Sequence, residues 1–273
     1  MAAVLSNWYS SSFRTKKRSI QEKTGNCVNE AIVVKSFVKE KILEMLGGNK
    51  MSIADMTIDS LYDLEQTIAA DLFKEQAYPW KVLPLIKDYI MALGSRLSFD
   101  EYDLIDGNVW IAKSAKVAPT AYIHGPAIIC KEAEIRHCAF IRGNAVVGEH
   151  CVVGNSTELK NVILFNYVQV PHYNYVGDSI LGYRSHMGAG SITSNVKSDK
   201  TMVSIKCDGK NTQTGLKKVG AFLGDYVEVG CNSVLNPGTV IGRNSNVYPL
   251  SSVRGCVPAN SIYKKAGEVV SKK

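Results

Sequence analysis

Aliphatic residues recur at every sixth position along most of the chain from Val109 onward. The first nine of them are Ile111, Val117, Ile123, Ile129, Ile135, Ile141, Val147, Val153 and Leu159. Glycine often follows, as in the Val-Gly pairs at 147–148, 153–154 and 229–230. An ordinary sheet strand would instead alternate with period two within one segment. A six-residue period predicts a parallel β-helix, in which three short strands form each coil of about 18 residues. The aliphatic residues then point inward, and small residues take the corners.

The period is interrupted at three places, and the first is between Leu159 and Leu164, which are only five positions apart. It shifts register in the stretch VPHYNYVGDSILG at 170–182, and we expect the corner beside His172 and Tyr175 to widen there. It stops altogether over 196–218 and resumes at Leu223. A long insertion in a compact repeat is usually functional or disordered. The Asp208-Gly209 pair predicts a hairpin arm within it, and its lysines make the arm basic.

Residues before the repeat have a helical pattern. A helix is expected over 29–48, where Gly47 and Gly48 end it. Apolar residues recur at helical spacing over 61–72 and again over 83–93, with a turn at Pro79-Trp80 between them. We therefore expect an extension at 1–27, a helical region at 28–104 that packs on the repeat, and a β-helix at 105–273 with its inserted arm. Residues 1–24 are Ser-rich and basic, which suits a disordered extension, an upstream start codon or a targeting peptide, and we favour the first two.

Composition narrows the choice of partners. The chain has 273 residues, of which 45% are hydrophobic and 21% charged, as in ordinary globular proteins. No apolar run is long enough for a membrane span, and no membrane partner is expected. The net charge of +7 suits an anionic small molecule, and no nucleic-acid-binding motif accompanies it. The seven cysteines form no CxxC pair, which indicates reduced thiols in a cytoplasmic protein.

Two cations occupy equivalent places in successive coils. Arg142 and Lys160 are 18 residues apart, and each directly follows an inward aliphatic residue. Side chains in adjacent rungs lie about 4.8 Å apart, where like charges repel unless an acid or an anion lies between them. The pair is therefore either two solvated side chains or a clamp for a phosphate group.

His172 is either a surface histidine or a catalytic base. A neutral imidazole in a cleft can accept a proton from an amine. The five histidines are not spaced by whole coils, so we expect no metal site.

Three segments in this order carry a resemblance to a known family. GNSTELKN (154–161), PHYNYVGDSILG (171–182) and GAGSITSN (188–195) resemble the acetyltransferase domain of the bifunctional glucosamine-1-phosphate acetyltransferase/N-acetylglucosamine-1-phosphate uridylyltransferase family. TGLKKVGAFLGD (214–225) and VGCNSVLNPGTVIG (229–242) are more similar to archaeal-type sugar-1-phosphate nucleotidyltransferases. From about residue 58 the chain also resembles short clostridial proteins labelled UDP-N-acetylglucosamine pyrophosphorylases. The resemblance implies a left-handed β-helix.

The resemblance also implies roles for individual residues. His172 would be the general base, and Asn195 would lie beside the acetyl thioester. Arg142, Lys160 and Tyr175 would hold the sugar phosphate. Lys200, on the arm, is similar to a lysine that reaches into a neighbouring subunit.

Acetyl-CoA is the cofactor that the resemblance implies. Ala189, Cys231 and Pro249 would line its groove, and Lys264 or Lys265 would meet its phosphate. His186 replaces an asparagine of the family at the substrate site, and Cys231 and Pro249 replace a serine and an alanine. These departures leave the sugar and the affinity for coenzyme A open.

The expected function is acetyl-CoA-dependent N-acetylation of a hexosamine 1-phosphate in a homotrimer, without metal or nucleic acid. A non-catalytic, sugar-nucleotide-binding β-helix and another acyl transfer are the alternatives. Uridylyl transfer is not expected, because residues 1–108 contain no nucleotide-binding domain with a G-x-G-T-R loop.

Overall fold

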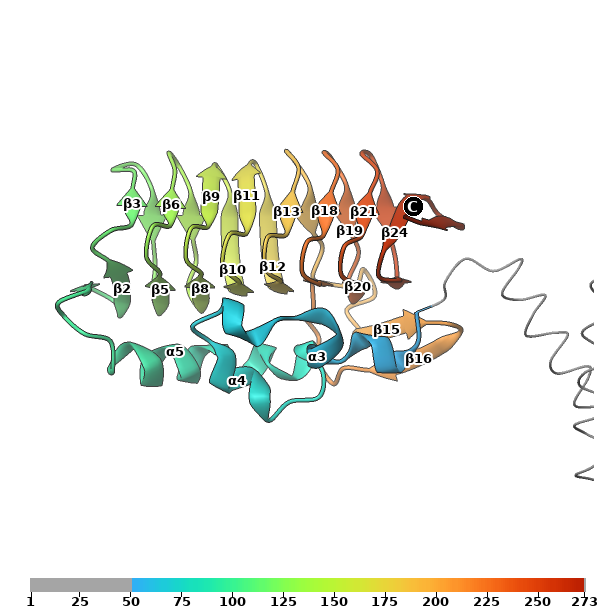
Figure 1. Cartoon of the computed structure of the whole chain (residues 1–273), viewed down its shortest axis with the longest axis horizontal. Helices are drawn as coiled ribbons and strands as arrows, with labels where there is room; N and C mark the ends of the chain where they lie inside the picture. Colours follow the sequence, from blue (N-terminus) through green and yellow to red (C-terminus); the bar gives the residue numbers. More distant parts are fainter. Residues whose placement is uncertain (1–50, 273) are drawn as a thin grey trace, which may run out of the picture. The chain divides into compact units, whose positions relative to one another are not determined.

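The computed structural model of the protein describes residues 51–272. The helix expected at 29–48 and the extension expected at 1–27 lie outside the described residues. The described residues belong to one compact unit, Gly48–Lys273. In it, a helical region, a three-sided stack of coils and a hairpin pack together (Figure 1).

The coils form a parallel β-helix with three faces. The upper face consists of β3 (Lys116–Val117), β6 (Glu134–Ile135), β9 (Val152–Asn155), β11 (Gln169–His172), β13 (His186–Met187), β18 (Glu228–Val229), β21 (Asn246–Val247) and β24 (Ser261–Lys265). The open face consists of β4 (Tyr122–Ile123), β7 (Phe140–Ile141), the starts of β10 (Glu158–Leu164) and β12 (Tyr175–Leu181), β14 (Ile192–Thr193), β19 (Val234–Leu235) and β22 (Ser252–Val253). The covered face consists of β2 (Val109–Ala112), β5 (Ala127–Ile129), β8 (Ala145–Val147), the ends of β10 and β12, β17 (Ala221–Leu223), β20 (Thr239–Ile241) and β23 (Cys256–Val257).

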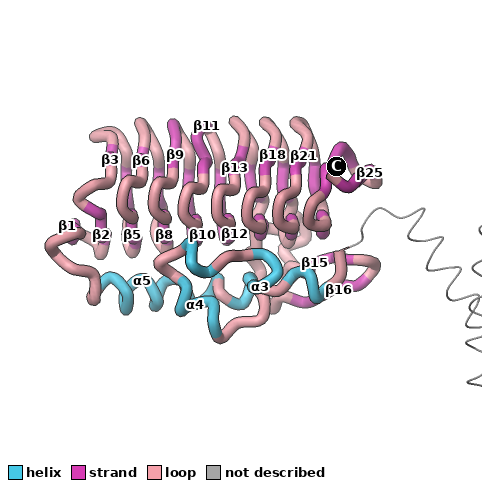
Figure 2. Tube along the Cα trace, viewed as in Figure 1, coloured by secondary structure: helices cyan, strands magenta, loops and turns pink. Residues whose placement is uncertain are grey.

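The aliphatic residues of the six-residue period fill the interior of the stack. On the upper face, Val117 pairs with Ile135, Ile135 with Val153, and Val153 with Val170, all in parallel register. Short strands joined by tight turns make each coil (Figure 2). Burying such a side chain contributes about 1.5–3 kcal/mol, so the period itself supplies the core. The left-handed parallel β-helix predicted from the sequence is confirmed.

Left-handed backbone conformations make the corners. Asn144, Asn161 and Asp178 turn the corner between the open and covered faces with φ of 50°, 54° and 48°. Tyr173 and Leu250 turn the corner between the upper and open faces with φ of 50° and 60°. Asn and Asp adopt this conformation more readily than other non-glycine residues, which explains their presence at the first of these corners.

The helical region is made of short elements. They are η1 (Ile53–Met56), α3 (Ile58–Leu61), η2 (Leu64–Gln66), α4 (Ala70–Lys74), η3 (Pro79–Lys81), η4 (Leu83–Leu85) and α5 (Ile86–Gly94). The helix expected over 83–93 is present as α5. The single helix expected over 61–72 was wrong, because Tyr62 and Thr67 are extended there. The N–H of Asp63 donates to the Asp225 carboxylate at 2.8 Å instead of to a helical carbonyl.

This helical region covers one side of the stack. The helix α5 packs on β5, β8 and β10 (Figure 1). The rings of Trp80 and Phe222 lie 6.2 Å apart. A Cβ at Gly94 would lie 2.5 Å from the Trp110 ring, so glycine allows the close approach of α5. The packing that the sequence predicted for the helical region is therefore present.

The arm forms the expected hairpin. Its strands β15 (Ser204–Cys207) and β16 (Lys210–Gln213) pair antiparallel across Asp208 and Gly209. The arm was expected to reach a neighbouring subunit, yet its hairpin packs on its own coils, beside β20 and β23. Val203 and Ile205 are fully buried there, since apolar side chains gain from contact with the covered face. The segment 196–202 remains exposed at most positions.

An antiparallel strand lies at each end of the parallel stack. β1 (Tyr102–Ile105) pairs antiparallel with β2 at the first coil. β25 (Glu268–Ser271) pairs antiparallel with β24 at the last coil.

Candidate active site

Two consecutive coils in the middle of the stack are one residue shorter than the coil before them. Glu134 and Val152 pair on the upper face at a separation of 18 residues, whereas Val152 and Gln169, and then Gln169 and His186, pair at a separation of 17. The shift of register seen in the sequence is therefore a real contraction of the coil.

The missing residue lies at the corner between the open and covered faces. The inward residues that flank this corner are five positions apart in Leu159–Leu164, where an ordinary coil has six. The expectation of a widened corner beside His172 was wrong, because Val170 and Val176 keep the six-residue spacing on either side of it. The corner that is shortened is instead the one at which Asn161 and Asp178 turn the chain in successive coils.

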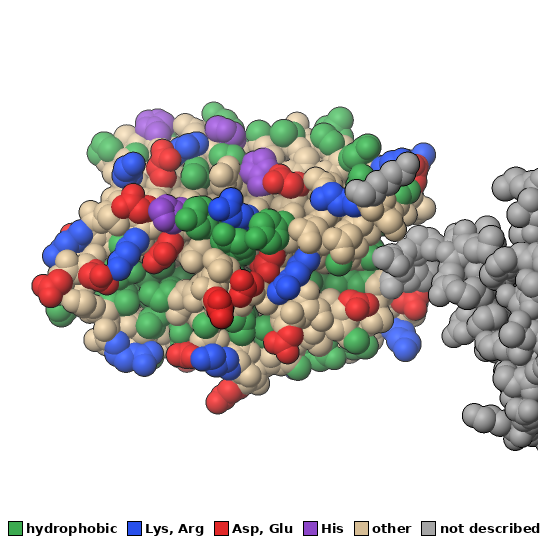
Figure 3. All heavy atoms as spheres, in the orientation of Figure 1, with side chains coloured by type: hydrophobic (Ala, Val, Ile, Leu, Met, Phe, Trp, Pro, Cys, Tyr) green, Lys and Arg blue, Asp and Glu red, His purple; other side chains and the backbone are tan. Residues whose placement is uncertain are grey.

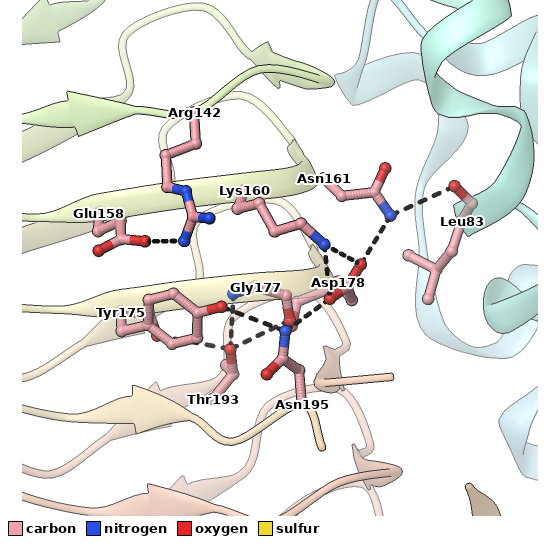
Figure 4. A network of polar contacts seen from close by, with 11 residues as sticks. Leu83, Arg142, Glu158, Lys160, Asn161, Tyr175, Gly177, Asp178, Thr193 and Asn195 are labelled. Carbon is pink, nitrogen blue, oxygen red and sulfur yellow. Dashed lines mark hydrogen bonds and ion pairs between the residues drawn. The ribbon is translucent and has the colours of Figure 1, made fainter. Parts of the chain in front are cut away.

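Asp178 is the centre of a hydrogen-bond network at this corner (Figure 4). Its buried carboxylate accepts from Lys160 Nζ at 3.1 and 3.2 Å, from Asn161 Nδ2 at 3.0 Å and from Asn195 Nδ2 at 2.6 Å. Asn161 Nδ2 also donates to the carbonyl of Leu83, at 3.4 Å, in the helical region. The predicted residues Lys160 and Asn195 are thus brought together by an acid that the sequence analysis did not identify.

Tyr175 lies flat over Gly177 and joins this network. A Cβ at position 177 would be only 2.4 Å from the Tyr175 hydroxyl, so glycine is required for this arrangement. Asn195 Nδ2 donates to the Tyr175 hydroxyl at 3.1 Å. Burial, and next the negative charge of Asp178, raise the pKa of Tyr175. The phenol therefore stays protonated, and its own hydrogen is available to a ligand.

Arg142 lies next to Lys160, one rung away, as the spacing predicted. Its guanidinium donates to Glu158 Oε1 at 2.7 Å. This hydrogen bond, with the charge of Glu158, raises the pKa of Arg142. Each of the two cations therefore has its own carboxylate, which relieves the repulsion between them.

His172 occupies the opposite edge of the open face. It is exposed at the corner between the upper and open faces, and its backbone N–H donates to Oδ1 of the buried Asn174 side chain at 3.1 Å. Asn174 Nδ2 in turn donates to the carbonyls of Gly188 and Ser191 at 2.9 and 3.0 Å. The buried amide therefore fixes the backbone that carries the imidazole.

The predicted coenzyme residues form a column with His172. Backbone hydrogen bonds link this corner from coil to coil: Gly190 N–H donates to His172 O, Asn232 N–H to Ala189 O, and Leu250 N–H to Cys231 O. His172, Ala189 and Cys231 therefore take equivalent positions, and Pro249 directly precedes Leu250 at the end of the column. Cys231 and Pro249 are exposed.

Three other predicted residues lie apart from both groups. His186 is on the upper face, where its Nδ1 is 2.8 Å from Glu228 Oε2. Lys264 forms an ion pair with Glu268 at 3.3 Å at the last coil. Lys200 is exposed in the turn that precedes the hairpin.

The predicted site residues thus gather at two edges of the open face. Arg142, Lys160, Tyr175 and Asn195 gather at one edge, and His172 heads the column of coenzyme residues at the other. Glu158 and Asp178 were missed by the sequence analysis. The contracted coil was the available signal for Asp178, because it places a Gly-Asp pair at the corner directly after inward Val176.

Within residues 51–272, no group of three or more His, Cys, Asp or Glu side chains could hold a metal ion. In the same part of the chain, no helix has both the length and the apolar character to cross a bilayer.

The comparisons with known proteins agree with this fold. A family model described as the GMPPB C-terminal domain matches residues 123–241. A bifunctional protein GlmU of Methanococcus maripaludis is 31% identical over 94% of this chain and 64% of its own length. A bifunctional sugar-1-phosphate nucleotidylyltransferase/acetyltransferase of Sulfurisphaera tokodaii is 30% identical over 68% of this chain and 47% of its own length. A hexapeptide transferase family protein from Anaplasma phagocytophilum is 16% identical and covers 60% of this chain and 79% of its own, with a TM-score of 0.35, which is too low to bear on function. The chain therefore spans about half to two thirds of these two curated relatives.

The repeat fold is a left-handed parallel β-helix. Over most of its length the chain is similar to part of the bifunctional GlmU proteins, as the resemblance in the sequence indicated.

Proposed function

We propose that the protein transfers the acetyl group of acetyl-CoA to the amine of a hexosamine 1-phosphate, with glucosamine 1-phosphate as the favoured substrate. The product would feed the synthesis of UDP-N-acetylglucosamine in the cytoplasm. The observation that carries the proposal is the open face, which has an exposed histidine along one edge and a cluster of polar donors along the other. A substrate lying across this face would contact both edges.

His172 acts as the general base in this proposal. It takes a proton from the neutral substrate amine as the nitrogen attacks the thioester carbonyl carbon. The tetrahedral intermediate then collapses, the C–S bond breaks, and the proton passes to the coenzyme A thiolate. Both amide hydrogens of Asn195 already have acceptors. A backbone amide is therefore the better candidate for stabilising the oxyanion.

The two cations bind the sugar phosphate. Each retains N–H groups that its carboxylate does not use, because Lys160 offers three hydrogens and Arg142 offers five. The Tyr175 hydroxyl adds one more donor. These groups suit the oxygens of a phosphate, which accept hydrogen bonds and donate none when fully ionised.

Coenzyme A lies along the column that His172 heads. The small side chain of Ala189 and the exposed positions of Cys231 and Pro249 would form its floor. Lys264, farther along the stack, would meet a phosphate of the coenzyme.

We also propose that three chains assemble around this face. The helical region and the arm occupy the covered face, so a partner has the open and upper faces to pack on. Tyr122, with 63% of its surface exposed, and Phe140 lie side by side on the open face with ring centroids 5.8 Å apart. A second chain would cover these rings and close the coenzyme column against water. Lys200 would then contact the neighbouring site from the exposed segment 196–202.

A thiol-release assay tests the proposal directly. Purified protein with acetyl-CoA should release free coenzyme A in the presence of glucosamine 1-phosphate, and more slowly with glucosamine or other amino sugars. Release that is equal with and without any amino sugar would refute it.

One observation favours a non-catalytic sugar-nucleotide-binding or scaffold protein as the second candidate. Both cations of the proposed clamp are paired with acids of the same chain, which lowers their free positive charge. Calorimetric binding of a sugar nucleotide without any acetyl transfer would support that candidate.

A further inference from the structure

Asp178 is one of two carboxylates that are buried among residues 51–272, together with Asp225. An ionised carboxylate only accepts hydrogen bonds. Both oxygens of Asp178 are occupied by donors from three residues, and one of these, Asn161, is anchored to Leu83 of the helical region. The carboxylate is therefore held in one orientation.

This carboxylate determines which way the Asn195 amide faces. Only the NH₂ end of an amide can face a group that accepts hydrogen bonds, so Nδ2 must be the atom 2.6 Å from Asp178 Oδ2. The second hydrogen of the same nitrogen goes to the Tyr175 hydroxyl. Asn195 has no N–H left, and its Oδ1 is the polar atom that remains for a ligand (Figure 4).

The network thus creates donors and one acceptor at the same edge of the open face. Tyr175 accepts from Asn195, so its own hydrogen is free to donate, and Lys160 retains one N–H beyond the two directed at Asp178. Asn195 Oδ1 differs from both, because it can only accept. A phosphate oxygen would find donors at Tyr175 and Lys160 but not at Asn195.

We propose that Asp178 is a positioning residue that turns Asn195 into a hydrogen-bond acceptor for an O–H or N–H group of the amino sugar. The pair then helps to determine specificity, since a ligand without a donor at this point leaves Oδ1 unpaired. This inference rests on the proposed acetyl transfer for its kinetic test but not for its structural one.

Exchanging the side chains of Asp178 and Asn195 with each other provides the kinetic test. Asp178→Asn allows the Asn195 amide to turn, and Asn195→Asp places two carboxylates together, so each should lower kcat/KM by about 10–100-fold. In the double variant Asp178→Asn/Asn195→Asp, the new amide donates to the new carboxylate, which again presents an accepting oxygen to the substrate. We expect the double variant to recover most of the loss. Recovery is impossible if Asn195 serves as an N–H donor, so a double variant as poor as the worse single variant would overturn the inference.

Asp225→Asn is the matched control. It removes the other buried carboxylate, which contacts no predicted site residue. We expect it to lower Tm while kcat/KM at a permissive temperature remains near that of the wild type. A comparable loss of kcat/KM in Asp225→Asn would show that Asp178 acts only by stabilising the fold, which would overturn its positioning role.

Neutron crystallography of the unliganded wild-type chain tests the orientation without any activity. Deuterium atoms on Asn195 Nδ2 should point at Asp178 and Tyr175. Deuterium atoms pointing away from Asp178 would overturn the inference even in an active enzyme. Correct orientation in a protein that acetylates no amino sugar would leave the positioning intact and refute only the proposed function.

Discussion

Lys160 and Asn195 share one carboxylate, although 35 positions separate them along the chain: Asp178 accepts from Lys160 Nζ at 3.1 Å and from Asn195 Nδ2 at 2.6 Å. Residues that share a partner do not act independently. Removing either one leaves the other with a carboxylate that has lost a donor. Substitutions at the two positions should therefore have effects that are less than additive.

A double-mutant cycle measures this coupling. We expect Lys160→Ala and Asn195→Ala each to reduce kcat/KM for glucosamine 1-phosphate, and their combination to cost less than the two losses multiplied together. A coupling energy of about 0.5–3 kcal/mol is usual for residues in one hydrogen-bond network. Strict additivity would mean that Asp178 does not connect the two residues in the working enzyme.

Replacement of His172 by alanine should abolish most of the turnover. A positioned general base contributes about 10²–10⁴-fold to kcat. The side chain is exposed, and its backbone is held by Asn174, so the Tm should change little. His150→Ala, at an exposed position of another corner, is the control. Normal turnover in a folded His172→Ala protein would exclude the assignment of His172 as the base.

Arg142→Ala should affect a phosphorylated substrate selectively. If the guanidinium binds phosphate, KM should rise far more for glucosamine 1-phosphate than for glucosamine. Arg136→Ala is a matched control, because Arg136 also forms a partly exposed ion pair, with Glu134 at 3.0 Å on the upper face. A similar rise of KM for both sugars would show that Arg142 has no role in phosphate binding.

Asp225 should make the stability of the fold depend on pH. Burial is the main reason that the pKa of its carboxyl is raised from 3.8, against the opposing effect of Arg243. The folded chain then binds this proton more tightly than the unfolded chain. The free energy of unfolding should accordingly fall as the pH rises from 3.8 through the raised pKa. Urea denaturation of wild type and Asp225→Asn across this range measures it, and the Asn variant should lack this part of the slope.

Light scattering should give a mass of about 90 kDa, three times the 29.9 kDa chain. Phe140→Glu should reduce the trimer, because it would place a charge among the exposed rings of the open face. Tyr226→Glu, at the corner between the covered and upper faces, should leave the mass unchanged. A monomer with full activity would refute the composite site.

The sequence predicted the core well, because the six-residue period follows directly from the geometry of a coil. Ile135 and Val153 needed no other information to be placed inside. The covered face was harder to predict, because aliphatic residues such as Ile128 and Ile163 also point outward there, and only contact with the helical region explains them.

The site was predicted in part. The stacking of Arg142 beside Lys160 follows from their spacing, but the position of Asp178, the acid partner of Lys160, depends on where a coil loses a residue. The helical spacing over 61–72 gave a wrong prediction, because it takes no account of a carboxylate far away in the sequence. The backbone N–H of Asp63 donates a hydrogen bond to Asp225. Charged groups of both signs are interspersed on the face seen in Figure 3.

The antiparallel strands β1 and β25 have a consequence for solubility at high concentration. A stack of parallel strands ends in unpaired backbone groups, and another stack could continue the ladder from them, as happens in fibrils. β1 and β25 run antiparallel to their neighbours at the two ends of the stack. A second stack therefore cannot continue the parallel pairing of strands on those faces. Deletion of residues 266–273 should expose the last coil and allow chains to join end to end into linear polymers.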